Sequence, residues 1–177
     1  RGVLGGAPCP VKLMKTIVED VGVSGITVAY GITEASSWIT MTRPDDPVEL
    51  RAGTIGTALP CNEVKIVDPQ TGEDVPAGIQ GELCTRGFLM MGYYRLPGAT
   101  SNAIDREGWY HTGDLGWMNE QGYFKITGRL KDVIRRNSLD IYPSELEEIL
   151  YRHPEIAEAQ VFGFPHREKG QEAAAWV

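Results

Sequence analysis

Cysteine is scarce in this 177-residue sequence, and long hydrophobic runs are missing. Its three cysteines, Cys9, Cys61 and Cys84, form no C-x-x-C pair and share no ligand spacing with the three histidines. This argues against a disulfide framework and a structural zinc site, and it favours a reducing compartment, by default the cytoplasm. Gly, Thr, Tyr or charged residues interrupt every apolar stretch well short of about 18 residues, so we expect no membrane span.

Basic residues are also in the minority, with 17 Lys and Arg against 24 Asp and Glu and a net charge of −7. This balance argues against nucleic acid or an anionic membrane surface as the main partner. It does not exclude a small anionic ligand, because a few well-placed donors can hold a phosphate. The usual signatures of P-loop NTPases, Rossmann dehydrogenases, zincins and α/β-hydrolases are absent from the sequence.

The composition is that of a soluble, globular protein, with 42% hydrophobic and 23% charged residues. The chain starts at Arg1 rather than Met and ends on the apolar run 173–177. We therefore expect a fragment of a longer protein, whose targeting cannot be read from these residues.

The hydrophobic pattern divides the chain into three stretches. Residues 10–21 predict a helix that Gly22 ends, and 26–30 predict a strand that runs into Gly31-Ile32-Thr33-Glu34. From about 54 to 128 the apolar period is two, which predicts a small antiparallel sheet or barrel.

After residue 128 the pattern changes again. We expect a strand at 133–136, a helix at 143–153 and strands at 156–164 and 173–177. Ser144 and Glu147 fit a capping box at the start of that helix. The charged segment 129–132 is the best candidate for a boundary or hinge.

Two glycine-containing motifs in the first 35 residues could bind a nucleotide. In Gly5-Gly6-Ala7-Pro8, small residues allow close approach of a flat ligand, although the motif alone is also an ordinary turn. In Tyr30-Gly31-Ile32-Thr33-Glu34, the ring can stack on a base, the hydroxyl can bind a phosphate and the carboxylate can hold Mg²⁺. The alternative for the second motif is a plain strand end.

Two further motifs lie later in the chain. Asp114, after Trp109-Tyr110-His111-Thr112-Gly113, could accept hydrogen bonds from a ribose, or it could cap a turn. With no carboxylate partner evident in the sequence, we interpret His111 as structural or pocket-lining. Arg129, in the segment 128–132, could bind phosphate or ribose oxygens, or belong to a solvated charge cluster.

Short motifs at 53–56, 81–83, 92–94, 122–124 and 141–143 accompany these four. In this order and spacing the chain resembles the adenylate-forming superfamily of acyl-CoA synthetases, peptide-synthetase adenylation domains and firefly luciferase. Residues 68–72 and 142–150 look most like short- or medium-chain fatty-acyl-CoA synthetases. The resemblance implies an α/β fold with mixed α+β parts. Residues 1–129 would be the later part of a large domain, with a small distorted antiparallel β-barrel at about 54–128. Residues 130–177 would start a small α+β domain.

The resemblance also implies an acid–thiol ligase. A carboxylic acid reacts with Mg·ATP to give acyl-AMP and pyrophosphate, and the acyl group then passes to CoA. Carried over by motif, the adenine-pocket residues would be Gly6, Ala7 and Pro8, with Tyr30 stacking beside Gly31. Thr33 would bind the phosphate and Glu34 would hold Mg²⁺. Asp114 would bind the ribose hydroxyls, and Arg129 the ribose or phosphate oxygens. Asp132 would be the hinge.

Three features limit the resemblance. The family's phosphate loop and its C-terminal lysine are both absent from the sequence, so we expect the isolated chain not to catalyse adenylation. The family's Gly-Gly-Glu-Asn segment is replaced by 137–140, which puts Asn137 and Ser138 on the expected CoA tunnel and predicts a weaker or altered thiol half-reaction. The alternatives are therefore a non-catalytic nucleotide-binding module and an adenylation domain with another thiol acceptor.

Trp38 could shorten an acyl pocket, but the more ordinary expectation is a core aromatic.

Overall fold

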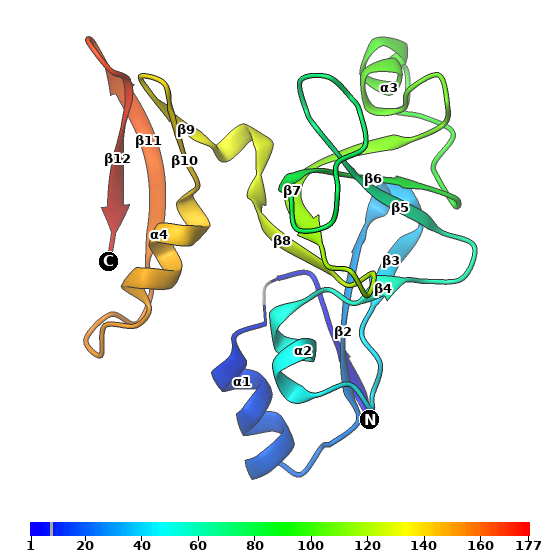
Figure 1. Cartoon of the computed structure of the whole chain (residues 1–177), viewed down its shortest axis with the longest axis vertical. Helices are drawn as coiled ribbons and strands as arrows, with labels where there is room; N and C mark the ends of the chain where they lie inside the picture. The colour runs from blue at the N-terminus through cyan, green and yellow to red at the C-terminus, as the bar shows by residue number, and fades with distance from the viewer. Residues whose placement is uncertain (8) are drawn as a thin grey trace. The chain divides into compact units, whose positions relative to one another are not determined.

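The structure is a computed structural model that describes residues 1–7 and 9–177. The chain divides into two compact units (Figure 1). The first contains Arg1–Thr112 and Gly116–Ile126, and the second contains Gly113–Leu115 and Thr127–Val177. Pro8 of the first glycine motif lies outside the described residues. The α/β fold class with mixed α+β parts is confirmed, whereas the domain limits and the hinge stay predictions.

The first unit begins with a sheet of order β1-β2-β3-β4. Its strands are β1 (Gly2–Leu4), β2 (Ile26–Ile32), β3 (Ser37–Met41) and β4 (Thr57–Ala58). β1 pairs with β2 in parallel, while β2 pairs with β3 and β3 with β4 in antiparallel fashion. The predicted strand at 26–30 is thus confirmed and is two residues longer, because β3 continues the pairing to Ile32.

Helices pack on this sheet through a core centred on Met14, Ile26 and Val28 (Figure 1). α1 (Val11–Lys15) continues into the π-helical segment Thr16–Asp20, and α2 (Val48–Gly53) lies against α1. The predicted helix at 10–21 is therefore confirmed in essence. Gly22 follows it with a φ of +76°, a conformation that ends a helix at little steric cost.

A second sheet in strand order β5-β6-β7-β8 follows. It is made of β5 (Glu63–Val67), β6 (Gly81–Arg86), β7 (Tyr110–Met118) and β8 (Phe124–Arg129), and α3 (Pro97–Ala103) lies between β6 and β7 in the chain. Alternation puts Ile66, Leu83 and Phe124 in one buried cluster and Val67, Cys84 and Trp109 in another. Within the described residues β5 and β8 lie at the two ends of the strand order, and β5 pairs with β6 in antiparallel fashion. The strand order does not describe a closed barrel.

The second unit has a sheet of order β10-β9-β12-β11 and one α-helix. The elements are β9 (Ile134–Arg136), β10 (Leu139–Ile141), α4 (Pro143–Leu150), β11 (Gln160–His166) and β12 (Gly170–Trp176). The helix is three residues shorter than predicted. Among residues 1–7 and 9–177, no helix has the length and apolar content that a membrane crossing requires.

The predicted capping box of α4 is wrong. The Ser144 hydroxyl donates to the carbonyl of Thr127, and a Glu147 carboxylate oxygen accepts from the backbone N–H of Val161 at 2.8 Å. Tyr142 holds the N-cap position instead. Both side chains bind neighbouring strands of the unit, a tertiary choice that the local pattern S-x-x-E does not encode.

One glycine allows β3 to approach β2. The β2–β3 register shifts between Tyr30 and Gly31, and a Cβ atom on Gly31 would overlap the backbone carbonyl of Ser37. No side-chain movement relieves this overlap, because the obstacle is main chain. Glycine is therefore required at position 31 for steric reasons.

We predict that Gly31→Ala lowers the free energy of unfolding by about 3 kcal/mol or more, at the upper end of single-residue effects. The matched control is Gly98→Ala in α3, where an added Cβ meets nothing within 4 Å. That control should leave stability unchanged or slightly raised. Urea unfolding of both variants measures the difference, and equal midpoints would contradict the packing argument.

Candidate functional site

Two turns leave the carboxyl end of the same parallel strand pair. β1 and β2 are in register from Gly2 and Ile26 to Leu4 and Val28, so Gly5-Gly6-Ala7 and Thr33-Glu34 both emerge at this edge of the sheet. Parallel sheets bind ligands at the carboxyl ends of their strands. Two of the four sequence motifs are therefore at one edge, as far as residues 1–7 and 9–177 show.

The glycine turn is open on one side and tightly packed on the other. Gly6 has a φ of +83°, and an added Cβ there would meet nothing within 4 Å. At Gly5 a Cβ would come within 2.8 Å of the Ala29 carbonyl and 2.7 Å of the Trp38 ring. Trp38 is 42% exposed, so the expectation of a core aromatic is wrong. Its ring covers the glycine turn. Spacing along the sequence could not predict this contact.

The Glu34 carboxylate is held by Tyr93, and the Tyr93 hydroxyl in turn contacts that of Tyr110; the sequence motifs had assigned neither tyrosine to a site. The Tyr93 hydroxyl donates to Glu34 Oε1 at 2.9 Å, and the Tyr93 and Tyr110 hydroxyl oxygens are 3.0 Å apart. The backbone N–H of Met90 also donates to the Glu34 carbonyl at 2.7 Å. The only sequence signal was the presence of both tyrosines in the family motifs. Their hydroxyls fix the position of a partly buried carboxylate, an oxygen ligand of the kind Mg²⁺ prefers.

The other residues of the two N-terminal motifs differ in exposure. Thr33 is exposed in the short 3₁₀ turn Thr33–Ala35. The Tyr30 ring packs against the cluster of Ile66, Leu83 and Phe124 and is half-buried. Only part of the Tyr30 ring is therefore accessible to a ligand. Its stacking on a base stays a prediction.

In the second unit, Asp114 and Arg129 form an ion pair. Arg129 Nε is 3.2 Å from Asp114 Oδ1, and Asp114 is only 6% exposed whereas the Arg129 side chain is 59% exposed. A buried carboxylate is costly without a partner, and this guanidinium supplies one. The exposed part of the guanidinium fork keeps donors available to solvent or to an anion.

The predicted hinge and tunnel residues are exposed. Asp132 ends the 3₁₀ turn Leu130–Asp132, and Asn137 and Ser138 form the two-residue loop between β9 and β10. Asn137 has a φ of +56° and its N–H donates to the Lys169 carbonyl at 2.8 Å. Asn137 thus takes the left-handed conformation that glycine would take, whereas Ser138 is not among the residues with positive φ.

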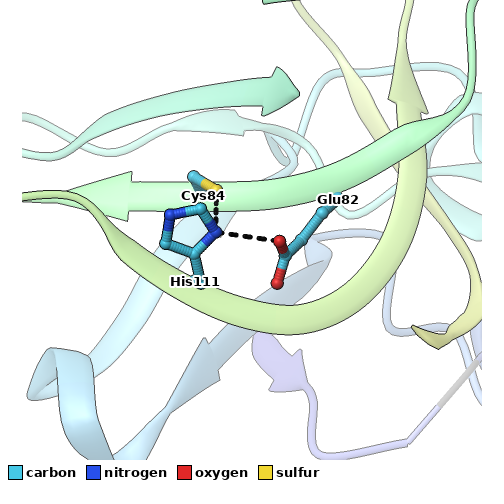
Figure 2. Close-up of side chains that lie close together, drawn as sticks. All are labelled: Glu82, Cys84 and His111. Atoms are coloured by element: carbon cyan, nitrogen blue, oxygen red, sulfur yellow. Dashed lines mark hydrogen bonds and ion pairs between the residues drawn. The ribbon is translucent and has the colours of Figure 1, made fainter. Parts of the chain in front are cut away.

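His111 has carboxylate partners, contrary to the expectation from the sequence. Its Nδ1 atom is 2.8 Å from Glu82 Oε2 and 3.4 Å from Cys84 Sγ (Figure 2). Its Nε2 atom is 3.7 Å from Asp105 Oδ2. These partners come from β6 and from the turn before β7, about thirty residues away in the case of Glu82. Spacing along the chain could not reveal them, because strand pairing brings them together.

Two pKa values around His111 are shifted. Burial, and then the Glu82 carboxylate, raise the pKa of the Cys84 thiol to about 12, so this thiol is protonated at neutral pH. Burial opposes ionisation of Asp105, but the backbone N–H groups of Trp109 and Glu107 together with His111 outweigh it and lower its pKa. The cluster therefore combines a neutral thiol at Cys84 with a carboxyl group at Asp105 whose pKa is lowered.

These features define an α/β protein with a ligand edge at its parallel strands. Comparison with known proteins gives the family. The AMP-binding enzyme model matches residues 1–94, and the AMP-binding enzyme C-terminal domain model matches residues 145–177. The chain belongs to the AMP-binding enzyme family, so the resemblance to adenylate-forming enzymes is confirmed.

The relatives that it matches are acyl-CoA synthetases by name. The chain is 52% identical over 177 residues to the acyl-CoA synthetase YngI of Bacillus subtilis (strain 168), covering 99% of this chain and 32% of YngI. It is 40% identical to the medium-chain acyl-CoA ligase ACSF2, mitochondrial, of Homo sapiens, covering 99% of this chain and 29% of that protein. The chain thus spans about a third of the length of these relatives.

Solved structures show the same fold. The ATP-bound MatB from Rhodopseudomonas palustris superposes with a TM-score of 0.89 at 31% identity, covering 98% of this chain and 34% of that one. The o-succinylbenzoate CoA synthetase MenE from Bacillus subtilis, in complex with ATP and magnesium ion, gives 0.84 at 32% identity, with 99% and 36% covered.

We predict that Cys84 is the slowest thiol of the native chain to react. Its raised pKa and its burial should make modification by a disulfide reagent at pH 8 at least about 100-fold slower than at the exposed Cys61. Mass spectrometry of the modified cysteine peptides, from a sample first treated with a chelator, measures these rates. In denaturant the two rates should converge, and equal rates in the native state would contradict the structure.

Proposed function

We propose that the chain is part of an ATP-dependent acid–thiol ligase, an acyl-CoA synthetase that converts a carboxylic acid and ATP to acyl-AMP and then to an acyl-CoA thioester. The carrying observation is that Gly5-Gly6-Ala7 and Thr33-Glu34 share one edge of the sheet, with Glu34 fixed by Tyr93. Family membership and the names of the relatives support the reaction class.

The motifs suggest a nucleotide-binding role for each of their residues. Gly6, Ala7 and Pro8 would line the adenine pocket, Tyr30 would stack beside Gly31, and Thr33 would donate to a phosphate. The buried Asp114 would accept from ribose hydroxyls, and the exposed donors of Arg129 would bind ribose or phosphate oxygens. Asp132 would be the hinge between the two half-reactions.

The donor set at Glu34 fits Mg²⁺, because a carboxylate and a neighbouring hydroxyl are hard oxygen ligands. When bound, the ion would neutralise charge on the phosphate oxygens. Tyr93 would orient the Glu34 carboxylate by its hydrogen bond at Oε1, and Thr33 would position the phosphate. The acid needs no general base, since a carboxylate is already ionised at pH 7.

We infer a short- or medium-chain fatty acid as substrate and CoA as acceptor. The name of the medium-chain relative supports this choice, and so does the Trp38 ring, which occupies space beside the glycine turn. The three free cysteines are consistent with a cytoplasmic enzyme, and the acidic charge balance with one that does not bind nucleic acid.

We expect the protein at its full natural length to catalyse carboxylate-dependent ATP–pyrophosphate exchange. A panel from acetate to dodecanoate, with benzoate as the aromatic member, should show a maximum at short or medium chains. Glu34→Gln should lower the exchange rate at least about 100-fold, because the magnesium ligand is lost. Tyr93→Phe should lower it about tenfold, with a raised KM for Mg·ATP, because the ligand is no longer oriented.

Glu73→Gln in the exposed turn after β5 is the matched control and should leave exchange unchanged. No exchange with any acid would move the assignment to a nucleotide-binding module without adenylation activity.

We further propose that Asn137 and Ser138 weaken the thiol half-reaction. Side chains replace glycines in a loop on the expected pantetheine path, and Asn137 keeps the positive φ required there. Asn137→Gly with Ser138→Gly should raise CoA-thioester formation several-fold while leaving ATP–pyrophosphate exchange unchanged. Single-turnover assays starting from acyl-AMP separate the two steps, and an unchanged thioester rate would disprove the idea.

A further inference from the structure

Three side chains of different chemistry converge on one face of the β5–β8 sheet. Glu82 and Cys84 are two residues apart on β6 and therefore point to the same side, and His111 reaches them from β7 (Figure 2). One ligand atom from each lies within 4.8 Å of the other two. In residues 1–7 and 9–177 this is the one group of three or more His, Cys, Asp or Glu side chains with such spacing.

The separations are close to those around a tetrahedral cation. Metal bonds of the length that zinc prefers place neighbouring ligand atoms about 3.3 to 3.6 Å apart. His111 Nδ1 is already 3.4 Å from Cys84 Sγ, and its 2.8 Å distance to Glu82 Oε2 must lengthen by only about half an ångström. The backbone of two paired strands therefore needs no rearrangement.

The second imidazole nitrogen is also suitably placed. His111 Nε2 faces Asp105 Oδ2 at 3.7 Å, and Asp105 is fixed by the N–H groups of Glu107 and Trp109 at 2.8 and 2.9 Å. A carboxylate on the outer nitrogen is the usual support of a metal-binding histidine, because it keeps the proton on that nitrogen and frees the other as a ligand.

The charges around the cluster favour a cation. Glu82 and Asp105 are the acidic groups nearest to the imidazole. Lys65 faces Cys84 across the β5–β6 register, but Asp74 pairs with its ammonium at 2.9 Å. The side of the cluster towards His111 is open, since that side chain is 31% exposed while Glu82 is 9% exposed.

We propose that Glu82, Cys84 and His111 form a binding site for a zinc-type divalent cation, with Asp105 as the supporting carboxylate. The mixed sulfur, nitrogen and oxygen donors suit a borderline-soft ion and not Mg²⁺ or Ca²⁺, which take oxygen ligands. Three protein ligands leave one position for water. The site is separate from the Glu34 cluster, because His111 follows Tyr110 directly on β7 and adjacent residues point to opposite faces.

Binding requires one proton to leave. Cysteine binds a metal as the thiolate, so a sulfur–metal bond at Cys84 forms as the sulfur–hydrogen bond breaks and the proton passes to solvent. The imidazole supplies its Nδ1 lone pair and the Glu82 carboxylate an oxygen, without redox change. Affinity should therefore rise with pH.

The test is a titration of the chelator-treated chain with cobalt(II), a spectroscopic substitute for zinc. We expect one equivalent to bind, with a thiolate-to-cobalt charge-transfer band and the visible bands of tetrahedral cobalt, which zinc then abolishes. About one proton per metal should be released in weak buffer at pH 8, and the Tm should rise with zinc but not with magnesium.

Variants identify the ligands. Cys84→Ser should abolish the charge-transfer band, and His111→Gln should weaken cobalt binding at least about tenfold. Cys61→Ser, an exposed cysteine outside the cluster, is the matched control and should bind cobalt like the unmodified chain. If Cys84→Ser does not fold, two measurements still test the proposal. They are cobalt binding by His111→Gln, a substitution at a partly exposed position, and the number of protons released. The absence of a stoichiometric cobalt spectrum, or an unchanged band in Cys84→Ser, would overturn the proposal, whatever the ATP–pyrophosphate exchange assay shows.

Discussion

The close approach of the β2 and β3 backbones at Gly31 is the constraint on which the first unit depends. With no Cβ at this position, the Ser37 carbonyl reaches β2, and the chain turns back within the few residues that carry Thr33 and Glu34. The same reversal places Trp38 over Gly5. One missing side chain therefore shapes both turns at the ligand edge, because backbone cannot move aside as a side chain can.

Alternation along β7 gives the second sheet two chemically different faces. Tyr110 joins Tyr93 and Glu34, whereas its neighbour His111 joins Glu82 and Cys84. Each cluster satisfies buried polar atoms that would otherwise be costly to remove from water. A shift of register by one residue would exchange the two faces and leave both sets of polar groups unpaired.

The second unit uses charge in a different way. Asp114 is buried and its partner Arg129 is largely exposed, so one member of the pair is desolvated while the other still faces water. Such a pair offsets part of the cost of burying the carboxylate, and it leaves guanidinium donors for an anion. The Asn137 loop adds a left-handed residue that the β9–β10 turn requires.

The sequence by itself determined the family, the strand at 26–30, the helix at 10–21 and the stretch of period two from about 54 to 128. These features are local or periodic, so spacing along the chain records them. Only the tertiary structure decided that Ser144 and Glu147 bind neighbouring strands instead of capping α4, and that Trp38 is a partly exposed cover for Gly5. It also brought Tyr93 to Glu34, and Glu82 and Cys84 to His111, over separations of 27 to 59 residues. Contacts of this range depend on strand pairing and register, for which no short stretch of sequence carries the information.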